Sequence, residues 1–281
     1  MTGSGAASHS PEGDGSWHAD LSLAHELADA ARAVIHDRDR STARSKPDGT
    51  PVTDADLHAD ATIVALLRDR RPDDAILSEE SGSHGDPAAP RRWIVDPLDG
   101  THAFLTGQGG WGTLIALEVN STLVLGLINH IADGRRYWAT RGGGAWSADL
   151  ADGELAHQRP LQVSSVTDLK DARVTAWPPV DTPAVRRLRT VGTWIEPDSY
   201  FLRRLIEGEV DVLLTTGGQV WDHAAQVIVV EEAGGRFQDP EGGRRLDLKG
   251  GLYTNGHLHD AVVTFLASGS NPSRADRAGN H

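Results

Sequence analysis

Several acidic residues of this chain stand where an apolar strand would end or a helix would begin. They are Asp56, Glu79, Glu80, Asp96, Asp99 and Asp222. Taken singly, each has a structural explanation; Asp56, for example, lies three residues after Thr53, the spacing of a helix capping box. Taken together, they point to one edge of an α/β sheet, where ligands collect. Carboxylates that converge there repel one another unless a cation neutralises them, so these acids predict a metal site.

The rest of the composition narrows the choice of metal. The chain has no cysteine, and its 13 histidines are dispersed. Oxygen donors select a hard ion, so we expect Mg²⁺, with Mn²⁺ as a substitute, rather than zinc. We expect His223, beside Asp222, to pack or face solvent rather than to bind a metal.

The hexapeptide from Asp96 to Thr101 is the most specific signal in the sequence. Its two carboxylates, Asp96 and Asp99, lie three residues apart and can share or bridge two metal ions, while the turn exposes the carbonyl of Leu98. Gly100 lets a phosphate approach the backbone, and the hydroxyl of Thr101 is left to hold a water. This combination suits hydrolysis of a phosphate ester, in which metal ions stabilise the attacking and leaving oxygens.

Three motifs in this order, Glu79-Glu80, the hexapeptide at 96–101 and Trp221-Asp222, resemble those of the inositol monophosphatase superfamily. The resemblance extends over roughly residues 21–266. It implies a five-layer αβαβα sandwich, an α/β fold of the inositol monophosphatase and fructose-1,6-bisphosphatase type. It also implies dependence on two or three Mg²⁺ ions, frequent inhibition by Li⁺, and a homodimer.

The resemblance also implies roles for particular residues. The metal ligands would be Glu79, Asp96, the carbonyl of Leu98, Asp99 and Asp222. Thr101, paired with Asp56 and assisted by Glu79, would help to activate the water, and the amides of Gly100 and Thr101 would hold the phosphate. We expect direct attack on phosphorus by a metal-activated water, without a covalent phospho-enzyme, because no motif sets out a serine, cysteine or histidine nucleophile.

Within the superfamily the chain looks most like the histidinol-phosphate phosphatases. Matching stretches include residues 46–53, 112–117, 134–146, 231–237 and 254–260. Histidinol phosphate is therefore the first substrate expected, and Asp198 would suit its cationic amine. No glutamate occupies the position of Thr215, where inositol phosphatases place one, which counts against inositol.

Two departures from this subfamily leave other functions open. The segment 172–196 looks shorter than expected, and the substrate loop reads Pro197-Asp198 instead of Gly-Asp. A phosphatase of a cyclitol, a sugar or a nucleotide 3′-phosphate, in a specialised biosynthetic pathway, is one alternative. A pseudoenzyme or regulatory binding module is another; it predicts a lost metal ligand, and none is lost here.

Apolar periodicity predicts the elements that must position these residues. We expect helices at 21–35, 53–67, 199–207 and 221–233, and strands at 75–77, 93–95, 113–119, 122–129, 136–140 and 210–214. Asp20 would cap the first helix, and Leu57 would face inward on the second. Asn120-Ser121 would form the tight turn of a hairpin.

The whole chain has 281 residues and a formal net charge of −13, which argues against a nucleic-acid binder because no basic stripe is available. We found neither an apolar run long enough to span a bilayer nor a signal peptide, so the expected compartment is the cytoplasm and no membrane partner is expected. The partner is then a small phosphorylated metabolite.

Two lobes are expected between polar tails. The tails would be residues 1–16 and 268–281, both expected to be disordered. The first lobe, 17–150, would carry most metal ligands, and the second, 151–267, would carry Asp222 and the substrate loop. The polar segment 141–160 marks the boundary.

Overall fold

The structure is a computed structural model that describes residues 17–36, 43–47, 49–151 and 153–268. Apart from Ser268, which ends the last helix, both predicted tails lie outside the described residues. No helix in the described part of the chain is long and apolar enough to cross a membrane.

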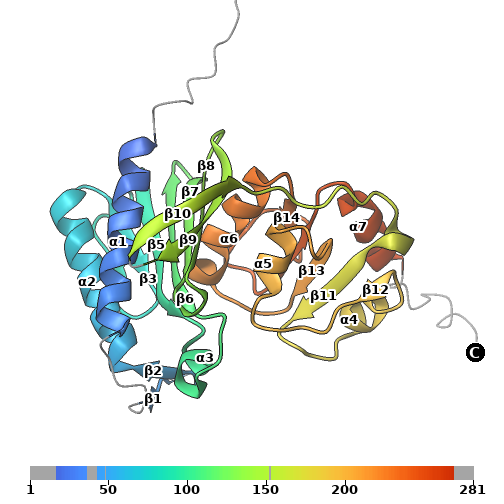
Figure 1. The fold of residues 1–281 in the computed structure, drawn as a ribbon, viewed down its shortest axis with the longest axis horizontal. Coiled ribbons are helices and arrows are strands. Elements are labelled where there is room, and N and C mark those ends of the chain that lie inside the picture. Colours follow the sequence, from blue (N-terminus) through green and yellow to red (C-terminus); the bar gives the residue numbers. More distant parts are fainter. Residues whose placement is uncertain (1–16, 37–42, 48, 152, 269–281) are drawn as a thin grey trace, which may run out of the picture.

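Five layers alternate between helices and sheets (Figure 1), so the predicted αβαβα sandwich is confirmed. In order, the helical layers are α1 (His18–His36) with α2 (Asp54–Arg70), then α5 (Phe201–Ile206) with α6 (Val220–Glu232), then α4 (Pro183–Leu188) with α7 (His259–Ala267). An eight-stranded sheet separates the first two helical layers, and a five-stranded sheet separates the last two.

The larger sheet has the strand order β10-β9-β8-β7-β6-β5-β3-β4. Its strands are β3 (Ala75–Ser78), β4 (Gly82–His84), β5 (Arg91–Asp99), β6 (Gly112–Val119), β7 (Thr122–His130), β8 (Arg135–Thr140), β9 (Gly144–Ala151) and β10 (Glu154–Pro160). Of these pairs only β3 and β5 run parallel. Their carboxyl ends therefore meet at one edge of the sheet. This is the arrangement that the acidic residues at these strand ends predicted.

The hairpin between β6 and β7 turns where the sequence predicted. Asn120 has φ 48° and Ser121 has φ 61°, so both turn residues adopt the left-handed conformation. Two consecutive residues in this conformation give the turn a twist that matches the right-handed twist of the flanking strands. The hairpin is central in the sheet and holds β5 from one side.

The smaller sheet has the order β12-β11-β13-β15-β14. Its strands are β11 (Arg173–Trp177), β12 (Thr193–Trp194), β13 (Val212–Thr215), β14 (Arg236–Gln238) and β15 (Gly251–Thr254). Helix α6 packs between the two sheets, and every side chain from His223 to Val230 is buried. Such a helix is apolar on all sides because it has no solvent face.

Short elements complete the edge of the fold nearest the acids. A two-stranded ribbon, β1 (Ala43–Ser45) with β2 (Pro51–Thr53), precedes α2, and α3 (Thr101–Thr106) follows β5. Both lie at the same end of the first sheet in Figure 1. Helix α3 contacts β2, so the two segments reach the carboxyl ends of β3 and β5 together.

Two sequence predictions about the first helical layer are wrong. Asp20 does not cap α1, because the helix begins at His18 and the Asp20 carboxylate accepts hydrogen bonds from Arg71 and Arg91 inside the fold. Leu57 is 37% exposed rather than inward-facing, because α2 buries the stripe that contains Ile63 and Leu67 instead.

The larger sheet continues beyond the boundary expected between the lobes. Strand β9 pairs with β8, and β10 pairs with β9, so residues up to Pro160 belong to the first sheet. In β10, the edge strand of this sheet, every residue is exposed or half-buried, which accounts for the polarity of the segment. The division of the chain into two lobes stays a prediction.

Candidate active site

Three carboxylates from three positions in the chain meet at the edge of the larger sheet. Asp96 and Asp99 lie at the end of β5, and Asp222 lies in the first turn of α6. One oxygen from each lies within 4.8 Å of the others. Glu79, directly after β3, lies near enough to interact with the Asp96 carboxyl group, and its Oε1 accepts from Lys46. The structure thus gathers three of the carboxylates predicted as metal ligands and places the fourth, Glu79, beside them.

The acids resist ionisation in this arrangement. Burial, followed by the charges of Asp222 and Glu79, raises the pKa of Asp99 to about 8. Burial and the neighbouring carboxylates raise the pKa of Asp96 well above its usual range, and burial likewise raises those of Glu79 and Asp222. Since each charged form is disfavoured by burial and by like charge, a cation would stabilise the whole cluster.

Local sequence explains how two of the acids are held. Asp222 is the third residue of α6 and accepts a hydrogen bond from the backbone N–H of Gln219, 2.5 Å away, as in a capping box. Asp96 accepts from the N–H of Leu98 at 3.0 Å, so the irregular last part of β5 fixes its carboxylate. Both contacts are made within three residues and need no distant partner.

A lysine that sequence analysis did not assign to the site lies beside it. The ammonium of Lys46 is 2.7 Å from Glu79 and 2.6 Å from Glu80. Burial lowers the pKa of Lys46, but the two carboxylates outweigh that effect and leave it above its usual range. Burial also raises the pKa of Glu80 to about 7. Residues 46–53 match the subfamily in sequence, but nothing in the sequence linked Lys46 to Glu79, 33 positions away.

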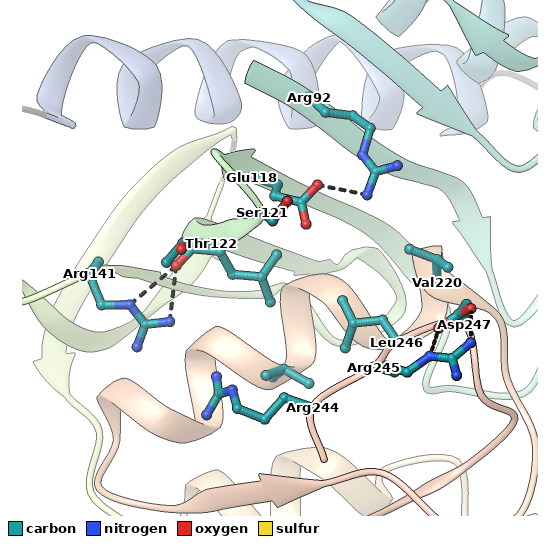
Figure 2. A pocket seen from close by; sticks show the side chains of 12 residues that line it. Arg92, Glu118, Ser121, Thr122, Arg141, Val220, Arg244, Arg245, Leu246 and Asp247 are labelled. Atoms are coloured by element: carbon teal, nitrogen blue, oxygen red, sulfur yellow. Dashed lines mark hydrogen bonds and ion pairs between the residues drawn. The ribbon is translucent and has the colours of Figure 1, made fainter. Parts of the chain in front are cut away.

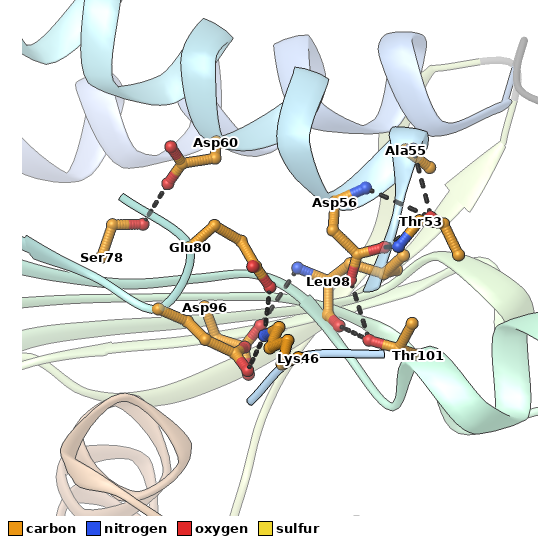
Figure 3. A network of polar contacts seen from close by, with 11 residues as sticks. Lys46, Thr53, Ala55, Asp56, Asp60, Ser78, Glu80, Asp96, Leu98 and Thr101 are labelled. Carbon is orange, nitrogen blue, oxygen red and sulfur yellow. Dashed lines mark hydrogen bonds and ion pairs between the residues drawn. The ribbon is translucent and has the colours of Figure 1, made fainter. Parts of the chain in front are cut away.

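The hydroxyl of Thr101 is tied to Asp56, as the family resemblance implied (Figure 3). Thr101 Oγ1 donates to Asp56 Oδ1 at 2.8 Å. The other Asp56 oxygen accepts from the backbone N–H of Thr53 at 2.8 Å and from its hydroxyl. Asp56 therefore completes the capping box of α2 and also holds Thr101, so its two interpretations are compatible.

The backbone conformation and the packing after β5 explain the glycine at position 100. Gly100 has φ +78°, a conformation that favours glycine, and an added Cβ would lie 3.2 Å from the Cβ of Trp111. Its N–H contacts the carboxylate of Asp99. The Leu98 carbonyl lies 3.1 Å from Thr101 Oγ1. Roles for Leu98 in metal binding and for the amides of Gly100 and Thr101 in phosphate binding stay predictions.

A cavity of about 380 Å³ opens beside the acids. Asp99, Gly100 and Asp222 form one wall. The lining also includes Trp177 and Phe201, whose rings stack at 5.1 Å with an interplanar angle of 16°. His102 and Gln226 add polar groups to the lining. Sequence analysis missed the aromatic pair, because Trp177 and Phe201 belong to a strand and a helix that meet only in the folded chain.

Asp198 lies next to this cavity but already has two partners. Its Oδ2 accepts from Arg204 at 2.5 Å, and its Oδ1 accepts from the N–H of Tyr200 at 3.0 Å. Its neighbour Ser199 lines the cavity, whereas Asp198 is absent from the lining found among the described residues. A contact between Asp198 and a substrate amine stays a prediction.

His223 has a packing role. It is 3% exposed, its Nδ1 lies 2.7 Å from the hydroxyl of Tyr253, and its Nε2 lies 3.1 Å from the carbonyl of Gly217. The neutral ring satisfies both contacts when Nε2–H donates to the carbonyl and Nδ1 accepts from the tyrosine, and burial lowers its pKa. The expectation that His223 packs is confirmed.

The donor set fits a hard divalent cation. The clustered groups are the carboxylates of Asp96, Asp99 and Asp222. Oxygen donors of this kind are those that Mg²⁺ and Mn²⁺ bind. The repulsion among Asp96, Asp99 and Asp222 supplies the electrostatic reason for holding such an ion.

Comparison with known proteins agrees with this geometry. Residues 17–268 match the model of the inositol monophosphatase family. The chain is 40% identical to a protein of Streptomyces griseus named glucose-1-phosphate thymidylyltransferase, covering 88% of this chain and 96% of that protein. It is 38% identical to the histidinol-phosphatase of Mycobacterium tuberculosis, over 90% and 99% of the two chains. Among solved structures, the extragenic suppressor protein suhB of Bartonella henselae superposes with a TM-score of 0.76 at 28% identity, over 89% and 99%.

Proposed function

The chain belongs to the inositol monophosphatase family, and we propose that this phosphatase hydrolyses a small phosphate monoester with Mg²⁺ as cofactor. One observation carries the proposal: Asp96, Asp99 and Asp222 place oxygens within 4.8 Å of one another beside a cavity. Thr101 and Asp56 form a hydrogen-bonded pair close to the same turn. The family's histidinol-phosphatases make histidinol phosphate the first substrate to test.

We propose that Glu79, Asp96, Asp99, Asp222 and the carbonyl of Leu98 hold the metal. When bound, Mg²⁺ would neutralise the carboxylates, lower the pKa of water at the site and stabilise the charge that develops on the phosphate. Strand β5 holds Asp96, Leu98 and Asp99, and α6 holds Asp222, so these four groups are positioned before the substrate arrives.

Thr101 would orient the attacking water. Its one hydroxyl proton is directed to Asp56, which leaves the Thr101 oxygen free to accept a hydrogen bond from water. Asp56 in turn is held by Thr53, so the proton path from water toward the carboxylate is prearranged. Glu79 lies close enough to the cluster to assist in taking up that proton.

The cavity favours a substrate with a single phosphate. Among the described residues that line it there is no lysine or arginine that would hold a second phosphate. The stacked Trp177 and Phe201 offer an apolar wall against which a ring can pack, as the imidazole of histidinol would. A sugar or cyclitol ring is the alternative. Inositol is the weaker candidate, because the hydroxyl of Thr215 already donates to the carbonyl of Gly251.

The site gives no support for nucleotidyl transfer, the reaction in the name of the Streptomyces griseus relative. Such a transfer needs room for a nucleoside triphosphate and a sugar phosphate together, with cationic side chains for the triphosphate. The cavity of about 380 Å³ has no lysine or arginine among its described lining residues.

A panel of phosphate esters tests the proposal. We expect phosphate release that requires Mg²⁺ and stops with EDTA, with the highest kcat/KM for histidinol phosphate. Inositol 1-phosphate and a hexose monophosphate should follow, and fructose 1,6-bisphosphate and adenosine 3′,5′-bisphosphate should be poorest. Asp96→Asn should lose several kcal/mol of transition-state stabilisation, about 10³-fold or more in kcat, while its melting temperature holds.

Each result has a clear reading. A bisphosphate as the best substrate would contradict the single-phosphate cavity. An Asp96→Asn enzyme with near-normal turnover would show that the metal site is misassigned. No release from any ester, while Mg²⁺ still binds, would favour a regulatory binding module instead.

Assembly and location also remain proposals, resting on the family resemblance. We propose a homodimer that works in the cytoplasm. Sedimentation of the purified full chain would give twice the monomer mass of 30.1 kDa. A monomer at micromolar concentration would contradict the dimer.

A further inference from the structure

Helix α6 places a second polar side chain in the cavity beside the acids. Gln226 stands four residues after Asp222, so the two side chains lie on the same face of the helix, one turn apart. Both line the cavity of about 380 Å³. At a rise of about 1.5 Å per residue, Gln226 lies about 6 Å further along α6 than Asp222. An ester whose phosphate is held at the acids therefore has its alcohol part in the space that Gln226 lines.

Gln226 is buried without a hydrogen-bonding partner. It is 6% exposed, and no described residue of the chain hydrogen-bonds to its carboxamide. The other two buried polar side chains in the described lining are engaged: the hydroxyl of Thr215 donates to the carbonyl of Gly251, and His223 uses both ring nitrogens. A buried amide without a partner lowers the stability of a fold, so its presence calls for an explanation.

Another face of α6 shows the opposite arrangement (Figure 2). Through Val220, the helix lines a cavity of about 470 Å³ there, and each described arginine around that cavity contacts a carboxylate. Arg92 pairs with Glu118 at 2.6 Å, and Arg245 pairs with Asp247 at 2.7 Å. The charged groups on that face are thus paired within the protein, whereas the carboxamide of Gln226 is left for a ligand.

The chemistry of the lining indicates what that ligand group is. A carboxamide is neutral and both donates and accepts hydrogen bonds, so it suits a hydroxyl group or an imidazole nitrogen. The stacked rings of Trp177 and Phe201 line the same cavity and offer an apolar face to a ring. Packing of this kind accepts any ring. A buried amide discriminates between rings, because an alcohol without a polar group would leave the amide unpaired.

We propose that the carboxamide of Gln226 hydrogen-bonds to the alcohol part of the substrate and selects esters whose alcohol is a ring bearing polar groups. The inference rests on the proposed phosphatase activity and adds to it the residue that distinguishes one alcohol from another. Two kinds of alcohol share the required chemistry. The imidazole of histidinol offers ring nitrogens, and a hexose offers hydroxyl groups.

Steady-state kinetics with three esters at saturating Mg²⁺ tests the proposal. Histidinol phosphate and glucose 6-phosphate carry the two kinds of polar ring, and phenyl phosphate carries a ring without a hydrogen-bonding group. Gln226→Met removes the carboxamide and keeps an unbranched side chain. It should lower kcat/KM at least tenfold for whichever polar ester the wild type prefers, and leave kcat/KM for phenyl phosphate equal or higher.

A stability measurement separates substrate binding from a structural role. The melting temperature of Gln226→Met should hold or rise, because the variant removes a buried polar group that has no partner. Gln226→Leu is a second apolar variant should the first lose its fold. Gln162→Met is the matched control. Gln162 is exposed and is not among the described residues that line the cavity, so this control should change neither kcat/KM nor the melting temperature.

The outcomes that contradict the proposal are distinct. Equal losses of kcat/KM for all three esters, or no loss for any of them, would overturn the assignment of Gln226. A lower melting temperature in both apolar variants would do the same, because it would give the side chain a structural role. A wild-type protein that releases no phosphate from any ester with Mg²⁺ would refute the proposed phosphatase activity, and this inference with it.

Discussion

The affinity for Mg²⁺ should depend steeply on pH, because protons and metal compete for the same carboxylates. In the metal-free fold the pKa of Asp99 is raised to about 8, from an ordinary value of about 4. A metal must displace this proton at any lower pH. For one proton with this pKa, the association constant for Mg²⁺ should rise about 50-fold between pH 6 and pH 8 and level off above pH 9.

The raised pKa of Asp99 also determines how the stability of the metal-free fold changes with pH. Because the folded pKa is the higher one, the unfolded chain ionises first as pH rises above about 4, and the metal-free fold becomes less stable up to and through pH 8. The loss is about 1.4 kcal/mol per pH unit for each such proton. Mg²⁺ should cancel most of it, since the bound cation favours the ionised carboxylates.

Calorimetry in two buffers of different ionisation enthalpy measures this linkage. We expect at least one proton released per Mg²⁺ bound at pH 6.5, because Asp99 is protonated there and the pKa of Asp96 is raised as well, and a smaller release as pH rises past 8. Glu80, with its pKa raised to about 7, titrates in the same range. Glu80→Gln is therefore the matched control, and it should keep the proton release if Asp99 is the source. An affinity for Mg²⁺ that stays constant from pH 6 to pH 8 would refute the reasoning.

Three further changes test individual contacts. Thr101→Val should lower kcat by about 10²-fold or more at unchanged melting temperature, because it removes the oxygen that Asp56 orients, and Thr101→Ser should restore most of it in steady-state assays. Ser121→Gly should stabilise the fold by about 1 kcal/mol in urea titrations, because Ser121 sits at φ 61°, and a lower midpoint would contradict the turn assignment. Leu27→Ala should cost about 2–5 kcal/mol in the same titration, since Leu27 is 0% exposed between α1 and the larger sheet, and a loss below 1 kcal/mol would argue against that packing.

The sequence by itself determined the parts of the protein that depend on neighbouring residues. The hairpin turn at Asn120 follows from the backbone conformation of two adjacent residues. The capping contact of Asp56 spans three positions, as does that of Asp222 with Gln219. Short contacts of this kind are readable because chain connectivity already holds the partners together. The positions of the acidic residues at the ends of β3 and β5 were predictable for the same reason, because each acid is close in sequence to the strand that positions it.

Tertiary structure decided what lies around those acids. Lys46 reaches Glu79 across 33 positions, and Trp177 meets Phe201 from another element. Neither composition nor periodicity specifies such pairs, because each depends on how the sheets and helices pack. The kind of chemistry was thus set locally by carboxylates at strand ends, whereas the shape and charge of the pocket for the departing alcohol arise only when the layers assemble.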